Sequence, residues 1–202
     1  MANTNIGLFF GTFNPIHVGH LILGNFMAQV PQIDQVWFVV TPRNPFKSKD
    51  TLLADVHRLA LVREAIEDNP RLEASNIEFD MPQPNYTVKT LAVLSEKYPD
   101  KNFTLIMGED NLRGFHKWKN YEVILENYDV LVYPRVYTEN EIPVVSEKEK
   151  ELLNHPKVQL VDAPLMKVSS STIRTMIAQG KDVQYILPHK VYTYVNEMNF
   201  YK

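Results

Sequence analysis

Two histidines stand three positions apart in GTFNPIHVGH, residues 11–20, the first segment whose residue types and spacing suggest chemistry. An apolar run precedes the segment and helical spacing follows it, so His17 and His20 are expected on one side of a first helical turn. Gly11 permits unusual backbone angles, and Pro15 restrains the loop. Free backbone N–H groups and the helix dipole attract phosphate at such a turn, and imidazole N–H groups can donate to its oxygens.

A metal site is the main alternative for this histidine pair, because two imidazoles at i and i+3 can share an ion. Such a site needs further ligands. The four other histidines show no paired spacing, and the chain has no cysteine, which excludes thiolate ligands, disulfides and cysteine nucleophiles. The G-x-G-x-x-G fingerprint of dinucleotide-binding proteins is also absent after the first apolar run. The sequence therefore favours phosphate binding.

A second segment with phosphate chemistry is VSSSTIRTMI, residues 168–177. The hydroxyls of residues 169–172 suit a helix N-cap, and the apolar residues that follow give one buried helix face. Capping explains one serine, but it does not explain Arg174, one turn inside the helix. A guanidinium there could make paired, charge-assisted hydrogen bonds to phosphate.

The elements that position these residues are predicted from apolar periodicity. Short β-rich runs alternate with segments of helical period. The runs are apolar throughout, as in a sheet covered on both faces, and helices between successive strands favour parallel crossovers. We expect strands at 6–10, 35–41, near 76–79, 102–108, 129–134 and 157–162, and helices around 18–26, 59–66, 87–97, 119–127, 171–178 and 188–197. The predicted fold is a doubly wound, parallel α/β sheet.

Composition narrows the remaining classes. A chain of 202 residues with 45% hydrophobic content has the size and core of one large domain. The formal charge of −3 gives no support to nucleic-acid binding. No apolar stretch approaches the ~20 residues of a membrane span, and the N-terminus lacks signal-peptide features. We expect one domain over residues 1–202, no nucleic-acid or membrane partner, and a cytoplasmic location.

The pattern G-T-F-N-P-x-H-x-G-H at 11–20 resembles the ATP-binding signature of the nucleotidylyltransferase superfamily, and most closely that of the bacterial nicotinate-nucleotide adenylyltransferase family. The resemblance implies a Rossmann-like nucleotidylyltransferase fold. It also implies adenylyl transfer from ATP to nicotinate mononucleotide, giving deamido-NAD and pyrophosphate, with Mg²⁺ carried by the ATP phosphates and no metal held by the protein. The implied ATP-binding residues of this segment are Gly11, Thr12, Phe13, His17 and His20, the two histidines being catalytic.

The resemblance continues along most of the chain. Residues 168–177 are similar to the family's I-S-S-T-x-I-R motif, which implies that Ser170, Thr172 and Arg174 hold the β- and γ-phosphates from the side opposite the first helix. The C-terminal part, from about 165 to 202, would then carry a phosphate-binding helix. Lys47 matches a basic residue that reaches the reacting phosphates, so the resemblance implies a catalytic role for Lys47 beside Arg174.

Three further segments are similar to the family's substrate pocket. Gly108 and Asp110 match a G-x-D element that contacts adenine and the ribose hydroxyls of ATP. The segment Asn85-Tyr86-Thr87 matches a motif whose backbone N–H groups recognise the pyridine carboxylate, and Trp118 matches a tryptophan that stacks on the pyridine ring. From the residues alone, helix capping also explains Thr87 and core packing also explains Trp118.

The chain departs from the family pattern at Phe10 and Asn14, where many members have Gly and Asp. Asn14 keeps a hydrogen-bond acceptor but lacks the charge, so any role that needs a carboxylate there is in doubt. Two substrate alternatives stay open, nicotinamide mononucleotide and phosphopantetheine. A non-catalytic nucleotide-binding regulator is an alternative of another class, although both histidines and Arg174 are present. The sequence also leaves the oligomeric state open, a homo-oligomer included.

Overall fold

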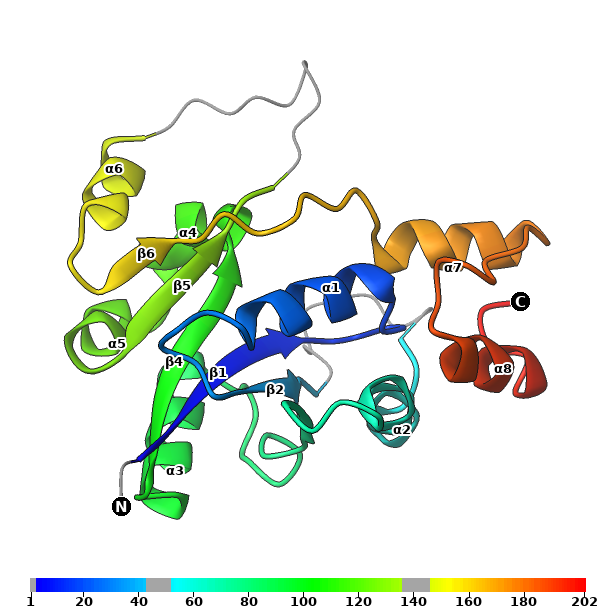
Figure 1. Cartoon of the computed structure of the whole chain (residues 1–202), viewed down its shortest axis with the longest axis horizontal. Coiled ribbons are helices and arrows are strands. Elements are labelled where there is room, and N and C mark those ends of the chain that lie inside the picture. The colour runs from blue at the N-terminus through cyan, green and yellow to red at the C-terminus, as the bar shows by residue number, and fades with distance from the viewer. Residues whose placement is uncertain (1–2, 43–51, 136–145) are drawn as a thin grey trace.

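Six parallel strands form one sheet in the order β3-β2-β1-β4-β5-β6 (Figure 1). The computed structural model describes residues 3–42, 52–135 and 146–202. The strands are β1 (Thr4–Gly11), β2 (Gln35–Val40), β3 (Leu72–Ser75), β4 (Lys101–Gly108), β5 (Asp129–Tyr133) and β6 (Val158–Leu160). The predicted doubly wound, parallel α/β fold is confirmed.

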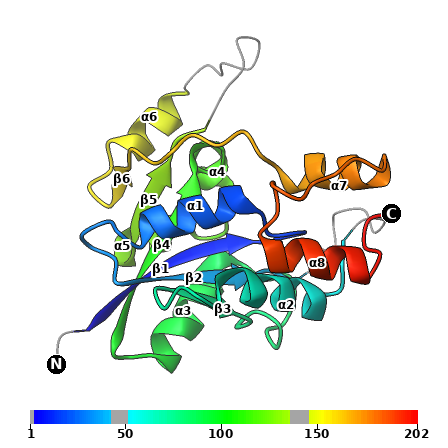
Figure 2. The same ribbon diagram turned by 45° about the vertical axis from the view of Figure 1, so that its right-hand side comes forward.

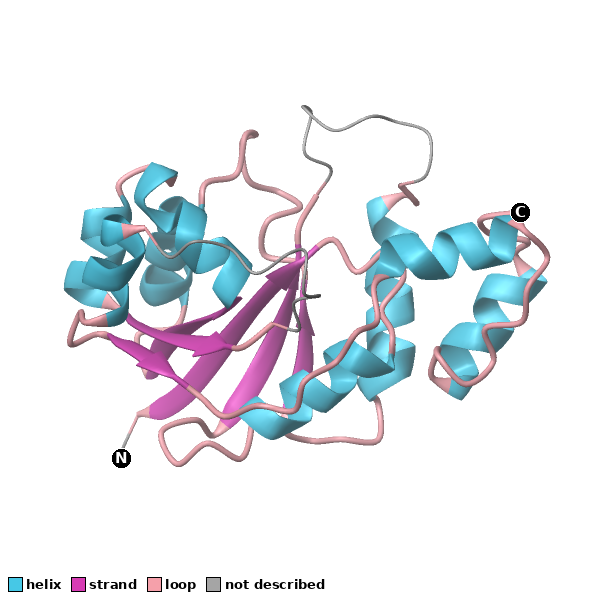
Figure 3. Ribbon diagram, turned by 90° about the horizontal axis from the view of Figure 1, so that it is seen from above, coloured by secondary structure: helices cyan, strands magenta, loops and turns pink. Residues whose placement is uncertain are grey.

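Helices cover both faces of the sheet (Figures 2 and 3). They are α1 (Val18–Met27), α2 (Asp55–Ile66), α3 (Thr87–Lys97), α4 (Glu109–Gly114), α5 (Tyr121–Asn127), α6 (Glu147–Leu153), α7 (Ser170–Ala178) and α8 (His189–Glu197), with a 3-10 turn η1 (Phe115–Lys117). Helices α1, α2, α7 and α8 contribute to one buried apolar cluster, and α3, α4, α5 and α6 contribute to the other.

The central strand β1 shows why a sheet with helices on both faces needs strands with consecutive apolar residues. Leu8 packs into the cluster beneath α3 to α6, whereas its neighbour Phe9 packs into the cluster beneath α1 and α2. Successive side chains of a strand point to opposite faces, so both must be apolar here. Both side chains are buried.

The predicted edge strand near 76–79 is displaced. Residues 72–75 form β3 and pair with β2, while 76–79 form a turn in which the Phe79 N–H donates to the Asn76 carbonyl at 2.9 Å. The apolar residues of the turn still pack against the core: Phe79 lies against the cluster of α1, α2, α7 and α8, and Ile77 lies against the cluster of α3 to α6. The apolar residue types of 76–79 are therefore compatible with a buried turn as well as with a strand.

Helix α6 begins with a run of alternating acidic and basic residues at 147–151, one of which is buried. Glu149 is buried and pairs with Arg113 of α4 at 3.0 Å. The short helix α4, which the sequence pattern did not predict, is thereby attached to α6. Within the described residues, none of the helices is long and apolar enough to span a membrane.

The neighbouring central strands β1 and β4 mark the point where the sheet changes its direction of winding. Ligands of open α/β sheets bind beyond the carboxyl ends of the strands at this point. Gly11 ends β1, and Gly108 ends β4. The segments that follow these two residues carry most of the predicted site.

Candidate active site

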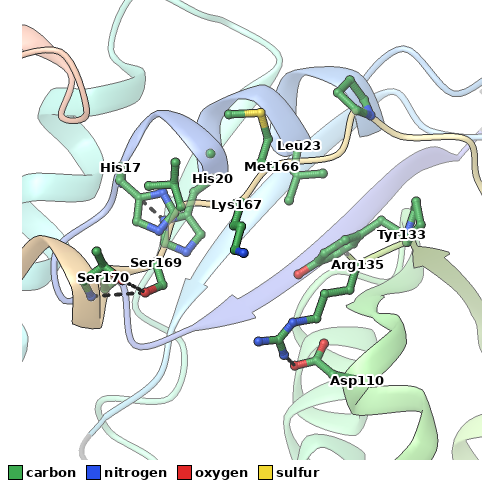
Figure 4. A pocket seen from close by; sticks show the side chains of 15 residues that line it. His17, His20, Leu23, Asp110, Tyr133, Arg135, Met166, Lys167, Ser169 and Ser170 are labelled. Carbon is green, nitrogen blue, oxygen red and sulfur yellow. Dashed lines mark hydrogen bonds and ion pairs between the residues drawn. The ribbon is translucent and has the colours of Figure 1, made fainter. Parts of the chain in front are cut away.

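A cavity of about 550 Å³, here called the histidine cavity, opens between the first turns of α1 and α7 and the ends of β4 and β5 (Figure 4). The two helix N-termini therefore border one space, as the sequence predicts, and such termini favour anions. The polar side chains that line the cavity belong to His17, His20, Asp110, Tyr133, Arg135, Lys167, Ser169, Ser170 and Thr172.

The two histidine rings of this cavity stack on each other, with centroids 3.7 Å apart and planes inclined by 22°. The backbone N–H of His17 donates to Nδ1 of His20 at 3.2 Å. A neutral imidazole carries its proton on one nitrogen only, so Nε2 of His20 is a donor. His20 is thus set up to donate one N–H to a ligand.

Burial lowers the pKa of both imidazoles. The pKa of His17 falls to about 4, and the pKa of His20 lies well below its usual value because of burial and, secondarily, because His17 is close. Both rings are neutral at physiological pH. They are suited to hydrogen bonding with an anion. In the described parts of the chain, no group of three or more histidine, aspartate or glutamate side chains is placed to hold a metal ion.

Phe13 supports His20 from behind. Its backbone φ is +45°, and its ring meets the His20 ring edge-to-face at a centroid distance of 5.1 Å. The ring also lies where a Cβ on Gly11 would be, 2.8 Å from the nearest ring carbon. Any larger residue at position 11 would displace Phe13, so glycine is needed here for close approach. Phe13 is buried and does not line the histidine cavity, although the sequence predicts that it binds ATP.

The N-terminus of α7 is tied to the loop that follows β1. Ser169 caps the helix by accepting from the Thr172 N–H at 3.1 Å, and Ser170 donates to the Pro15 carbonyl at 2.9 Å. Arg174 donates to the Asn14 carbonyl at 2.8 Å. Arg174 does not line the cavity, but its Nε is buried and has no hydrogen-bond partner in the described part of the molecule.

Asp110 and Arg135 form an ion pair of 2.7 Å on the wall opposite the histidines, and both are partly exposed (Figure 4). Lys167 lines the same cavity and extends its amine into the space between His20 and that pair. Gly108 lies just behind Asp110, where a Cβ would come within 2.6 Å of the carboxylate. Asp110 and Gly108 were predicted from the sequence, whereas Arg135 and Lys167 were not, because they belong to no motif.

A second cavity of about 590 Å³, here called the tryptophan cavity, lies beyond the ends of β1 and β2. Trp118 meets Phe115 edge-to-face at 5.2 Å, so it packs on the core and lines the cavity at once. The N-terminus of α3 faces the same space through Asn85-Tyr86-Thr87. Tyr86, not Thr87, is the N-cap residue, and it makes no side-chain capping bond. Gly11 and Thr12, predicted to bind ATP, line this second cavity and not the histidine cavity.

Arg58 is the main structural residue that sequence reasoning missed. It is fully buried in α2 and donates to the carbonyls of Thr12, Thr41 and Leu53 and to the carboxylate of Asp55. A guanidinium has several donors in a fixed plane, so one side chain can hold the loops after β1 and β2 together. Its position in a helical pattern gives no signal of this role.

The structure thus divides the predicted residues between two cavities. His17, His20, Asp110, Ser170 and Thr172 line the first, and Gly11, Thr12, Trp118 and the segment 85–87 line the second. Phe13, Gly108 and Arg174 stand behind these residues. Lys47 lies outside the described residues. The first cavity is bordered by two helix N-termini, which favour anions, and the second by an aromatic ring and the N-terminus of α3.

Helix N-termini beyond the carboxyl ends of a parallel sheet are typical of nucleotide-binding α/β proteins. Residues 8–176 match the cytidylyltransferase-like family. Curated relatives called probable nicotinate-nucleotide adenylyltransferase include one from Flavobacterium johnsoniae, 55% identical over 98% of both chains, and one from Cytophaga hutchinsonii, 46% identical over 97% of both. The chain belongs to the nicotinate-nucleotide adenylyltransferase family. A solved structure, the Plasmodium falciparum nicotinic acid mononucleotide adenylyltransferase complexed with NaAD, shares the fold with a TM-score of 0.80, covering 98% of this chain and 97% of the other at 19% identity.

Proposed function

We propose that the protein transfers the adenylyl group of ATP to nicotinate mononucleotide, releasing pyrophosphate and forming deamido-NAD. The observation that carries the proposal is the pair of cavities on either side of the loop after β1, one lined by the histidines and the other by Trp118. ATP would occupy the histidine cavity, and the mononucleotide would occupy the tryptophan cavity. The 5′-phosphate of the mononucleotide would then attack the α-phosphorus of ATP directly.

This reaction asks for positioning and charge stabilisation, because the attacking phosphate is already an anion and needs no general base. The neutral His20 would donate its Nε2–H to the α-phosphate. His17, Lys167, Ser170 and Thr172 would bind the charge that moves onto pyrophosphate. Arg174 stands behind this wall, so its unpaired Nε–H would reach the phosphates through a change of side-chain rotamer. No covalent intermediate on the protein is expected.

The polar lining of the histidine cavity suits the triphosphate itself, so a Mg²⁺ ion would arrive bound to the phosphate oxygens. The cavity offers N–H, O–H and ammonium groups, which suit phosphate, and its carboxylate Asp110 is paired with Arg135. Mg²⁺ bound in this way would neutralise part of the triphosphate charge. Asp110 would contact the ribose of ATP after exchanging its partner Arg135 for the hydroxyls.

The tryptophan cavity favours an acid over an amide on the pyridine ring. The N-terminus of α3 has no side-chain cap, and Lys117 and Lys119 line the same space. A helix N-terminus and two ammonium groups stabilise a carboxylate more than a neutral carboxamide. Trp118 would stack on the ring, and the segment 85–87 would bind its carboxylate.

Pyrophosphate release with ATP and Mg²⁺ tests the proposal. The purified protein should turn over nicotinate mononucleotide with a higher kcat/KM than nicotinamide mononucleotide, and phosphopantetheine should give no release. A higher kcat/KM for nicotinamide mononucleotide would identify the amide as the preferred substrate. Absence of release with all three acceptors would overturn the enzymatic function.

A further inference from the structure

Glu78 is a buried carboxylic acid on the wall of the tryptophan cavity that the proposed reaction does not use. The side chain is 2% exposed, although it belongs to a residue type that is rarely buried without a partner. It lies in the turn after β3, which the sequence pattern assigned to a strand. No motif predicted a role for it.

One oxygen of this carboxyl is held, and the other is free. Thr90 of α3 donates its hydroxyl to Oε1 at 2.7 Å, and Asn85 donates its amide to the Glu78 backbone carbonyl at 3.1 Å. Oε2 is buried and has no hydrogen-bond partner among the described residues, and the same is true of the Asn85 side-chain oxygen. The cavity wall therefore holds two neighbouring residues that each carry an unused acceptor.

Leaving a buried acceptor unpaired costs free energy, so a ligand that brings donors gains from meeting these oxygens. Burial also raises the pKa of Glu78, while the side chains of Thr90 and Asn85 oppose the rise. Nicotinate mononucleotide ends in a carboxylate and a phosphate, and both would be repelled by an acidic group. Its vicinal ribose hydroxyls are the donors it offers at neutral pH.

We propose that Glu78, with Asn85 beside it, binds the ribose diol of the mononucleotide and so determines the orientation of its 5′-phosphate. This inference rests on the proposed function, because it needs the mononucleotide in the tryptophan cavity. Thr90 positions Glu78 by donating its hydroxyl to Oε1, which leaves Oε2 as the acceptor that the diol would meet. Asn85 would give its side-chain oxygen to the diol, while the backbone N–H groups at the start of α3 and the ammonium groups of Lys117 and Lys119 would bind the pyridine carboxylate.

The test compares Glu78→Gln with wild type on nicotinate mononucleotide and on its 2′-deoxy and 3′-deoxy analogues. Glutamine keeps the size of the side chain and can still accept from Thr90, but it loses the anionic acceptor. Hydrogen bonds to charged groups are worth enough to lower kcat/KM by about 10- to 100-fold. We expect this loss through the KM of the mononucleotide, with the KM of ATP unchanged. The matched control is Glu73→Gln, the same change at an exposed position of β3.

The analogues distinguish a ribose contact from a purely structural role. The kcat/KM of the wild type should fall by a similar factor when at least one deoxy analogue replaces nicotinate mononucleotide. The kcat/KM of Glu78→Gln should not fall further when the same analogue replaces the parent substrate. The proposal would be overturned if the effects of the substitution and of the missing hydroxyl on kcat/KM multiplied independently. It would also be overturned if the wild type had the same kcat/KM for both deoxy analogues as for nicotinate mononucleotide. A change in the ratio of acid to amide turnover would do the same, because it would put Glu78 beside the ring substituent.

Two further measurements keep the test decisive. If Glu78→Gln does not fold, as judged by circular dichroism, the wild-type analogue series and Asn85→Ala provide the same comparison. If wild type releases no pyrophosphate, the proposed function has failed, and calorimetric binding of nicotinate mononucleotide and its analogues still measures the diol contact. Equal affinities for parent and deoxy analogues would then refute it.

Discussion

Replacing His20 by alanine should lower kcat strongly and the stability of the fold only moderately. The side chain accepts the His17 backbone N–H at 3.2 Å, which leaves Nε2–H as the donor for the α-phosphate. Removing one preorganised donor to a developing charge lowers kcat by about 10²- to 10³-fold. The stability cost is smaller, because the change loses one hydrogen bond worth about 1 kcal/mol and the edge contact with Phe13, worth about 1 kcal/mol.

The two effects are measured independently. Thermal unfolding should shift by roughly 4–8 °C for a loss of about 2 kcal/mol in a chain of this size. Pyrophosphate release at saturating ATP and nicotinate mononucleotide should fall by the larger catalytic factor. His189→Ala, at an exposed position of α8, should change neither quantity. Near-normal turnover of His20→Ala would refute the role of this imidazole.

The pH profile tests the protonation state of the same residue. The pKa of His20 is well below 6.5, so the imidazole stays neutral as the pH falls from 8 to 6. The pH profile of kcat/KM should therefore have the same shape in the wild type and in His20→Asn, with no titration step near pH 6.5 that only the wild type shows. Such a step would mean that His20 acts as a cation, contrary to its burial.

Three further changes follow from the contacts around the site. Arg58→Met should destabilise the fold by about 3–5 kcal/mol in urea titrations, because it leaves buried partners unpaired, whereas the exposed Arg63→Met should be neutral. Tyr201→Phe removes a 2.7 Å hydrogen bond to the Asn14 side chain and should raise the KM of ATP about 3- to 10-fold with little change in kcat; an unchanged KM would separate the C-terminal residues from the ATP loop. The pKa of His17 is lowered to about 4 from 6.5, so the unfolded chain binds a proton first as the pH falls. Up to about 3 kcal/mol of stability should therefore be lost between pH 6.5 and 4, and His17→Gln should lack this part of the loss in unfolding measurements.

Elements with strong local patterns were predictable from the sequence. The strands of the sheet centre are continuous apolar runs, and their order along the chain requires parallel crossovers. The edge strand β3 was misplaced because LEAS is short and polar, whereas the neighbouring NIEF has the apolar content expected of a strand. Pairing with β2 decided between them, and pairing is a property of the whole fold.

Charged residues with no local motif were beyond prediction for a different reason. Arg58 and Glu78 stand in ordinary amphipathic or loop contexts, where a charge is normally solvated. Their burial results from segments distant in the sequence, such as Thr12 and Thr41 around Arg58. The division of the predicted residues between two cavities is likewise tertiary, since Gly11 and His17 are six positions apart but line different spaces.

Asn14 shows how such tertiary contacts account for a departure from the family pattern. Its side-chain oxygen accepts from the Leu53 N–H and the Tyr201 hydroxyl, and its carbonyl accepts from Arg174. The residue is 3% exposed, and an uncharged amide meets these donors without the cost of burying a carboxylate. Segments before α2, in α7 and at the end of the described chain thus converge on one position between β1 and the histidines. The loop that presents His17 and His20 is therefore held from outside by hydrogen bonds to an uncharged residue, and no charge at position 14 is needed to position it.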